Sequence, residues 1–185
     1  MIRVPRSLVM TALVFAATVS ASCFDPVHAD DVAARGPEQS GVREGPTHRP
    51  GQPCLVCHGG SGPASAEFEI AGTIYELRES PSAPVADVTI VISDSSSPPK
   101  LVTLTSNQAG NFYLQKDRET LYYPLHIEID DDRIKQDHPS TPLGGKIRSM
   151  VTPIGRNGGC AFCHVDNLDP TDSTTRMPHV FLNAK

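Results

Sequence analysis

The sequence predicts a mainly β fold: a small antiparallel β-sandwich of about six or seven strands, flanked by two short segments carried on loops. Apolar and polar residues alternate in short runs between residues 66 and 152, a pattern typical of strands with one buried face. The 17 prolines and 14 glycines interrupt the chain too often for long helices. Because tryptophan is absent and aromatic residues make up 5%, the core must rest on Val, Ile and Leu.

The individual strands follow from this alternation and from the turn residues between them. The longest expected strand, 121–129, turns its odd-numbered residues inward and His126 outward. Pro124 within it indicates an edge position or a bulge, because proline has no N–H to donate to a neighbouring strand. The expected strands are 68–74, 88–92, 101–105, 112–114, 121–129 and 146–151.

The N-terminal residues 1–29 have the features of a secretory signal peptide. Arg3 and Arg6 precede a short apolar run over 8–19, which is too short to span a bilayer comfortably. We expect cleavage after Ala29, which removes Cys23, the one cysteine outside a C-x-x-C-H pattern, and leaves no odd thiol. In the alternative, Cys23 carries a lipid and anchors the mature protein to a membrane. Either way the protein is exported, to the periplasm or beyond, or held on the outer membrane.

The mature chain divides into four segments. Residues 30–53 are rich in Gly, Pro and charged residues without apolar periodicity, and are expected to be a flexible tether. A first motif segment spans 54–65, the β-sandwich spans 66–152, and a second motif segment with the C-terminal tail spans 153–185. The glycines and Pro63 that come after the first motif exclude a continuing helix.

Each motif segment contains the pattern C-x-x-C-H, in Cys54-Leu55-Val56-Cys57-His58 and in Cys160-Ala161-Phe162-Cys163-His164. This pattern is typical of a c-type haem attachment site, because the two thiols form thioethers to one porphyrin and the following His ligates its iron. Cys54, Cys57, Cys160 and Cys163 are therefore expected to hold two haems covalently, with His58 and His164 as the proximal iron ligands. A four-cysteine zinc site is the alternative, although it leaves both histidines unexplained. Disulfides or redox-active dithiols also remain open, although a thioredoxin-like dithiol needs a βαβ context that is missing here.

The sequence determines less clearly which residue binds the other face of each iron. His48, just before the first motif, and His179, shortly after the second, are the candidates. His126, His138, Met150 and Met177 are further residues of suitable type, and of these His126 and Met150 are better explained as strand residues. Histidine outnumbers methionine among the candidates, which favours two-histidine coordination and a low reduction potential.

Three stretches of the β segment resemble the carboxypeptidase regulatory-like domain, a transthyretin-like β-sandwich. They are Ala71-Gly72-Thr73-Ile74-Tyr75, Pro84 to Ile90, and Thr105 to Tyr113, and the resemblance covers about residues 68–130. That family's domain is a non-catalytic accessory module, so the resemblance implies no catalytic residue. The flanking pair of C-x-x-C-H motifs resembles exported multihaem c-type cytochromes, which implies a dihaem cytochrome with an inserted β-sandwich.

The function expected from these features is electron transfer between redox partner proteins. The chain has a net charge of −5, which gives no indication of nucleic acid as a partner and favours partners with basic faces. No catalytic residue is predicted. Two other classes stay open: a secreted β-sandwich binding module with a structural zinc site, and a dihaem peroxidase-like enzyme, which needs one iron with an open distal face. The two motifs are expected to lie near each other, because the ends of a compact domain are often close.

Overall fold

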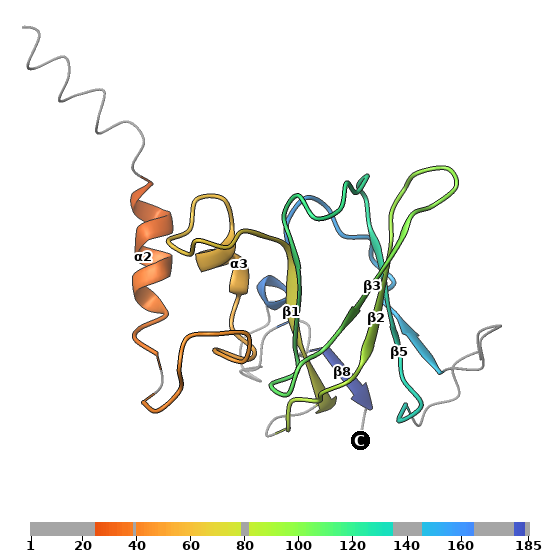
Figure 1. Ribbon diagram of the computed structural model, residues 1–185, viewed down its shortest axis with the longest axis horizontal. Coiled ribbons are helices and arrows are strands. Elements are labelled where there is room, and N and C mark those ends of the chain that lie inside the picture. The colour runs from red at the N-terminus through yellow and green to blue at the C-terminus, as the bar shows by residue number, and fades with distance from the viewer. Residues whose placement is uncertain (1–24, 39, 79–81, 135–145, 165–179, 184–185) are drawn as a thin grey trace, which may run out of the picture. The chain divides into compact units, whose positions relative to one another are not determined.

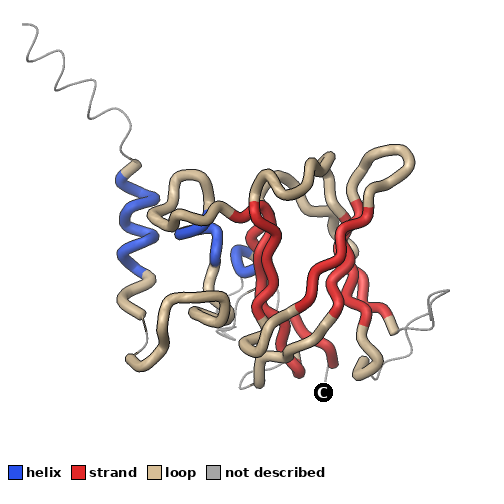
Figure 2. Tube along the Cα trace, in the orientation of Figure 1, coloured by secondary structure: helices blue, strands red, loops and turns tan. Residues whose placement is uncertain are grey.

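The computed structural model describes residues 25–38, 40–78, 82–134, 146–164 and 180–183. They form eight strands in two sheets with few helical residues, which confirms the predicted mainly β fold (Figures 1 and 2). The chain divides into two compact units, Met1–Arg35 and Gly36–Lys185. The described part of the first unit is mainly α2 (Pro26–Ala34). Asp25 caps this helix, because its carboxylate accepts hydrogen bonds from the backbone N–H groups of Val27 and His28.

The first sheet is built around β1 (Phe68–Leu77), which is the longest of the described strands. On one edge, β4 (Asn111–Gln115) pairs with β1 in antiparallel orientation. On the other edge, β7 (Gly158–Gly159) and β8 (Val180–Asn183) both pair with it in parallel orientation. This sheet is therefore mixed rather than antiparallel throughout, and it takes in strands from the segment 153–185, which the sequence predicts to lie outside the sandwich.

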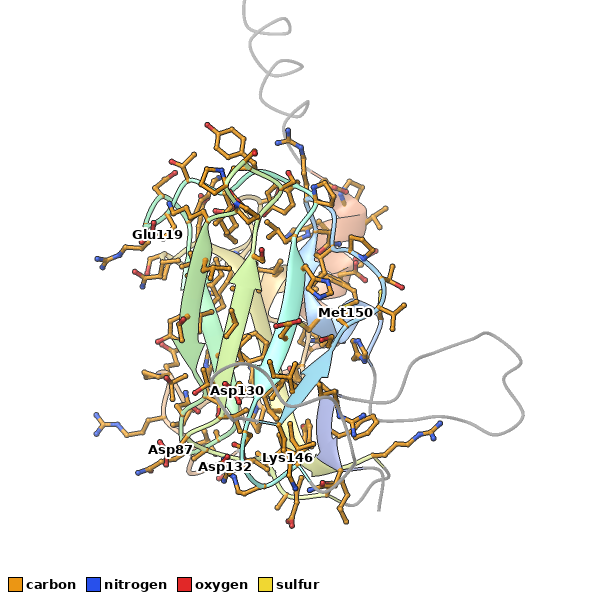
Figure 3. The ribbon with its side chains drawn as sticks, turned by 90° about the vertical axis from the view of Figure 1, so that its right-hand side faces the viewer. Asp87, Glu119, Asp130, Asp132, Lys146 and Met150 are labelled. Carbon is orange, nitrogen blue, oxygen red and sulfur yellow. The ribbon has the colours of Figure 1, made fainter. Side chains whose placement is uncertain are left out.

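The second sheet is antiparallel throughout and has the order β3 (Leu101–Thr105), β2 (Thr89–Ser93), β5 (His126–Asp130) and β6 (Ile147–Ser149). Figure 3 shows it face on, with Met150 at its β6 edge. The strand expected over 101–105 is found with the same bounds.

The expected strand over 121–129 begins only at His126, because Pro124 cannot donate to a ladder. Leu125 instead makes an isolated bridge to Ile154. The odd-numbered residues of this stretch from 125 onward are buried as expected, and His126 is partly exposed.

The apolar core lies between the two sheets and consists almost entirely of aliphatic side chains. Each large aliphatic side chain that is fully buried contributes about 1.5–3 kcal/mol to folding relative to its exposed state. The core is formed by Ile70, Ile74, Val88, Ile90, Ile92, Val102, Phe112, Leu114, Leu121, Leu125, Ile127, Ile129, Ile134 and Leu182.

The strand β1 differs from the others because it is buried on both faces. Every residue from 70 to 75 is buried, although only Ile70 and Ile74 of this stretch belong to the core cluster between the sheets. The opposite face carries Ala71 and Thr73 and is covered by residues that precede β1 in the chain. Gly51 donates its N–H to the Thr73 hydroxyl, which in turn donates to Asn111.

Within the segment 30–53, which the sequence predicts to be a flexible tether, residues 46–51 are hydrogen-bonded to the first sheet and to the turn that leads into β4. The Asn111 amide donates to the carbonyl oxygen of His48, and the Asn107 amide donates to that of Pro46. The predicted cleavage point after Ala29 falls within α2, and Cys23 and most of the predicted signal peptide lie outside the described residues. In the part of the chain that is described, no helix has the length and apolar character needed to cross a bilayer.

Asp94 generates a prediction about acid stability. Its side chain is buried and accepts hydrogen bonds from the Ser96 hydroxyl and from the backbone N–H groups of Ser96, Lys100 and Tyr122. The Ser96 hydroxyl above all, joined by these N–H groups, lowers the pKa of Asp94 to about 2 against the opposing effect of burial. A lowered carboxyl pKa stabilises the fold above pH 4, and the stabilisation is lost as the pH falls towards 2.

We expect Asp94→Asn to unfold at lower urea concentration than the wild type at pH 7, and the difference to shrink between pH 4 and pH 2. The exposed Asp132, substituted in the same way, serves as the control and should change little. An equal loss of stability at pH 7 and pH 2 would contradict this role of the Asp94 charge.

Candidate haem-binding site

The two C-x-x-C-H motifs are single helical turns that pack against the same strand. The first forms α3 (Cys54–His58), and the second begins with η1, one turn of 3₁₀ helix (Cys160–Phe162). Both contact β1, and α3 also contacts β7. Figure 1 shows α3 beside β1. The expectation that the two motifs lie near each other is therefore confirmed. The helix α3 ends at its histidine, and η1 ends at Phe162, before Cys163 and His164.

Hydrogen bonds from the glycine-rich loop end the first turn. Gly59 donates its N–H to the carbonyl oxygen of Leu55, and Ala64 donates to that of Cys57. A side chain at Gly62 would collide with the Cys57 backbone, so the loop can fold back over α3 only with glycine there. The sequence predicts from these glycines that the helix ends here. The carbonyl groups at the helix end accept their hydrogen bonds from backbone N–H groups of the loop.

Three glycines allow the second motif to approach β1. A Cβ atom on Gly72 would lie 2.9 Å from the Cys160 sulfur, and one on Gly159 would overlap the Phe162 ring. A Cβ atom on Gly158 would overlap the carbonyl oxygen of Glu69. These contacts place Cys160 beside Gly72, where its side chain packs against the edge of the sandwich core.

The sulfur atoms of the two motifs differ in their surroundings. Burial raises the pKa of Cys54 to about 11 and that of Cys160 to about 12, and the charge of Cys54 adds to the rise at Cys160. Cys54, Cys57 and Cys160 are half-buried and Cys163 is exposed, and all four thiols are free. With pKa values raised in this way, the thiols of Cys54 and Cys160 are protonated at neutral pH.

His58 is held in one orientation by a hydrogen bond and an aromatic stack. Its Nδ1 lies 2.8 Å from the carbonyl oxygen of Ala66, and since a carbonyl only accepts, Nδ1 carries the proton. The other ring nitrogen, Nε2, then has its lone pair available for a metal. The ring stacks on Phe68 at 4.1 Å between centroids, and Phe68 stacks on Tyr113 at 4.5 Å.

The position of Phe68 depends on an irregularity in β1. Simple alternation puts Phe68 on the same face as Ile70, in the core. The register between β1 and β4 shifts between these two residues, and Phe68 lies instead with Tyr113 on the outer face. The shift therefore supplies the flat apolar surface on which His58 rests.

His48, a predicted distal ligand, lies beside His58. The two ring centroids are 5.8 Å apart, and the ring planes make an angle of 68°. Two imidazoles on opposite sides of one metal have centroids about 6 Å apart, since each metal–nitrogen bond is about 2 Å long. Glu38 Oε1 lies 3.3 Å from Nδ1 of His48, and the Arg49 guanidinium, which bonds the same carboxylate, lowers the pKa of Glu38 below its usual value.

The other predicted ligands do not join this site or lie outside the described residues. His126 is on β5, and Met150 comes directly after β6 (Figure 3), so both belong to the second sheet, whereas the motifs pack on β1. His179, His138 and Met177 lie outside the described residues. His164 is half-buried and donates its backbone N–H to the carbonyl oxygen of Cys160.

The donor set of the first motif fits a covalently bound haem: two thiols and a histidine lie on one turn, and the ring of a second histidine, His48, lies beside it. The second motif supplies the same thiols and histidine. Among the described residues, no three side chains of the His, Cys, Asp or Glu type converge as ligands of a single metal ion.

Sequence reasoning missed Glu38, Phe68 and Asn111 as parts of this site. Asn111 belongs to an expected turn, and Phe68 is explained equally well as a core residue of an alternating strand. Glu38 is one acidic residue in a polar segment, and no spacing relates it to His48. Only the folded contacts identify these three.

Comparison with known proteins finds no family model, no curated protein and no solved structure that matches this chain. The resemblances to the carboxypeptidase regulatory-like domain and to multihaem cytochromes therefore stay predictions. A function for the chain has to be inferred from its fold and from the geometry of the site.

The pairing of β7 with β1 generates a prediction about stability. We expect Gly158→Ala to lower the free energy of unfolding by about 1–3 kcal/mol, because the added methyl group collides with the Glu69 carbonyl and must displace one of the strands. Urea unfolding of the two proteins measures the change. Gly155→Ala is the matched control, since its Cβ meets nothing within 4 Å. Equal stability of the two variants would show that β7 does not need this close approach.

Proposed function

We propose that this protein is an exported dihaem c-type cytochrome that carries electrons between redox partners. The observation that carries the proposal is the placement of two C-x-x-C-H turns on one strand, with Nε2 of His58 left available. Haem, when bound, supplies one-electron redox chemistry, and the chain supplies its binding, its orientation and its electrostatic surroundings.

The residues that would hold the two haems are those of the motifs. Cys54 and Cys57 would attach the first, with His58 and His48 as its axial ligands. Cys160 and Cys163 would attach the second, with His164 as the proximal ligand and His179 as the distal candidate predicted from sequence. The role of the chain is to fix the distance between the two groups, to orient the imidazoles and to limit solvent access.

The β-sandwich suits the role of a rigid support. The first motif rests on the outer face of β1 and the second comes directly after β7, so both are tied to a strand that is paired on both edges. A rigid support keeps the geometry of the ligands unchanged between oxidised and reduced states. This is what an electron carrier needs, because the preorganised surroundings then do not have to rearrange with each transfer.

Export, partners and chemistry are part of the same proposal. The signal peptide 1–29, or the alternative lipid anchor at Cys23, would bring the chain to the compartment where c-type haem is attached in bacteria. Removing 1–29 takes away two arginines and one aspartate, so the mature chain stays acidic and favours partners with basic faces. No catalytic residue is assigned.

The number of covalent haems per chain tests the proposed function. In a host that attaches c-type haem, we expect the pyridine haemochrome spectrum and the intact mass of the purified protein to give two haems per chain. The double variants Cys54→Ala/Cys57→Ala and Cys160→Ala/Cys163→Ala should each keep one. A protein with zinc and no haem band would favour the binding module with a structural metal. Rapid reaction of the dihaem protein with hydrogen peroxide would favour the peroxidase-like enzyme.

A further prediction concerns His48 as the second ligand of the first haem. We expect His48→Ala to convert one of the two haems from low spin to high spin in the electron paramagnetic resonance (EPR) spectrum, because its iron loses an axial nitrogen. His126→Ala, which alters an exposed histidine of the second sheet, is the matched control and should leave both signals unchanged. If the two variants give the same spectrum as the wild type, His48 is not a ligand.

A further inference from the structure

Glu38, Arg49 and His48 form a charged cluster beside the first motif. The proposed function gives Glu38 and Arg49 no role. Glu38 Oε1 accepts a hydrogen bond of 2.6 Å from Nε of Arg49, and it lies 3.3 Å from Nδ1 of His48. The remaining guanidinium nitrogens of Arg49 donate to the carbonyl oxygen of Gly36 and to the side chain of Gln52. The same carboxylate oxygen, Oε1, thus lies against both the arginine and the His48 ring.

The backbone of this loop is held in an uncommon conformation. Arg49 has a φ of 48°, in the left-handed region that non-glycine residues seldom adopt. Such a conformation persists where the surrounding contacts enforce it. Here the contacts are the hydrogen bonds of the guanidinium and the bond from the Asn111 amide to the His48 carbonyl. Together they fix both the backbone of His48 and the position of Glu38.

The His48 ring has one buried nitrogen whose hydrogen bonding is incomplete. Nδ1 is enclosed, and in the described part of the chain no hydrogen bond with good geometry reaches it. An unpaired buried donor is costly, and the Glu38 carboxylate at 3.3 Å is close enough to accept from it after a small rotation of the ring. Such a bond would place the proton on Nδ1 and leave the lone pair on Nε2, as the Ala66 carbonyl does for His58.

We propose that Glu38 is the positioning residue of His48, and that its carboxylate, held by Arg49, orients the imidazole and increases its basicity as an iron ligand. This inference rests on the proposed function. Carboxylates behind a metal-bound histidine are known to act in this way in metal sites generally. A more basic ligand and a nearby negative charge both favour ferric iron, so Glu38 lowers the reduction potential of the first haem.

The test compares two glutamates of the same loop in the full-length dihaem protein. Glu38→Gln keeps the shape of the side chain and its ability to accept from Arg49, but it removes the charge. We expect a spectroelectrochemical titration to give a higher potential for one haem and an unchanged potential for the other, with a shift in one of the two low-spin EPR signals. Glu44→Gln, which removes an exposed charge from the same loop, should change neither quantity.

The outcomes separate this inference from the proposed function. If the wild type carries two haems and Glu38→Gln gives the potentials and EPR signals of Glu44→Gln, Glu38 has no positioning role and the cytochrome proposal stands. If both haems shift equally in Glu38→Gln, the effect is not local to His48 and the inference is likewise overturned. A wild type without covalent haem overturns the proposed function and this inference with it.

Discussion

The pairing of β1 on both of its edges is the constraint on which the rest of the structure depends. A strand with residues buried on both faces cannot leave its N–H and C=O groups to water, so each edge needs a partner. The strand β4 supplies one edge, and β7 and β8 supply the other. Because β7 ends where the second motif begins, satisfying that edge carries Cys160 to the strand against which α3 already packs. Two motifs that are far apart in the chain are thus brought together by backbone hydrogen bonds rather than by a direct attraction between them.

The same strand also organises the ligands of the first motif. The shift of register at its start turns Phe68 outward to support His58, and the Thr73 hydroxyl and Asn111 hold the loop that carries His48. The histidines therefore meet because two loops, one before α3 and one after it, are fastened to the outer face of one sheet. In the proposed function this face is the supporting surface of the first haem.

The strands of the second sheet and most of the core were predictable, because strict alternation and clear turns are local signals. The sequence did not predict β7, since two consecutive glycines have no periodicity, and their role appears only in the close contact with Glu69 and Phe162. The strand predicted over 121–129 was also too long at its start. The structure begins β5 at His126, because Pro124 lacks the N–H that a ladder needs, whatever the apolar pattern. The spacing of the cysteines and histidines predicts the two motifs as haem sites, and this stays a prediction. The attachment of residues 46–51 to the first sheet was not predicted, because it comes from hydrogen bonds to residues distant in the chain.

The central claim is that both motifs hold haem on the β1 side of one sandwich. Diffraction from crystals of the haem-loaded protein, with anomalous data collected at the iron absorption edge, tests this most directly. The account predicts two iron positions beside β1, one of them between the rings of His48 and His58. Iron positions at opposite ends of the sandwich, or a zinc ion among the four cysteines in place of iron, would contradict it.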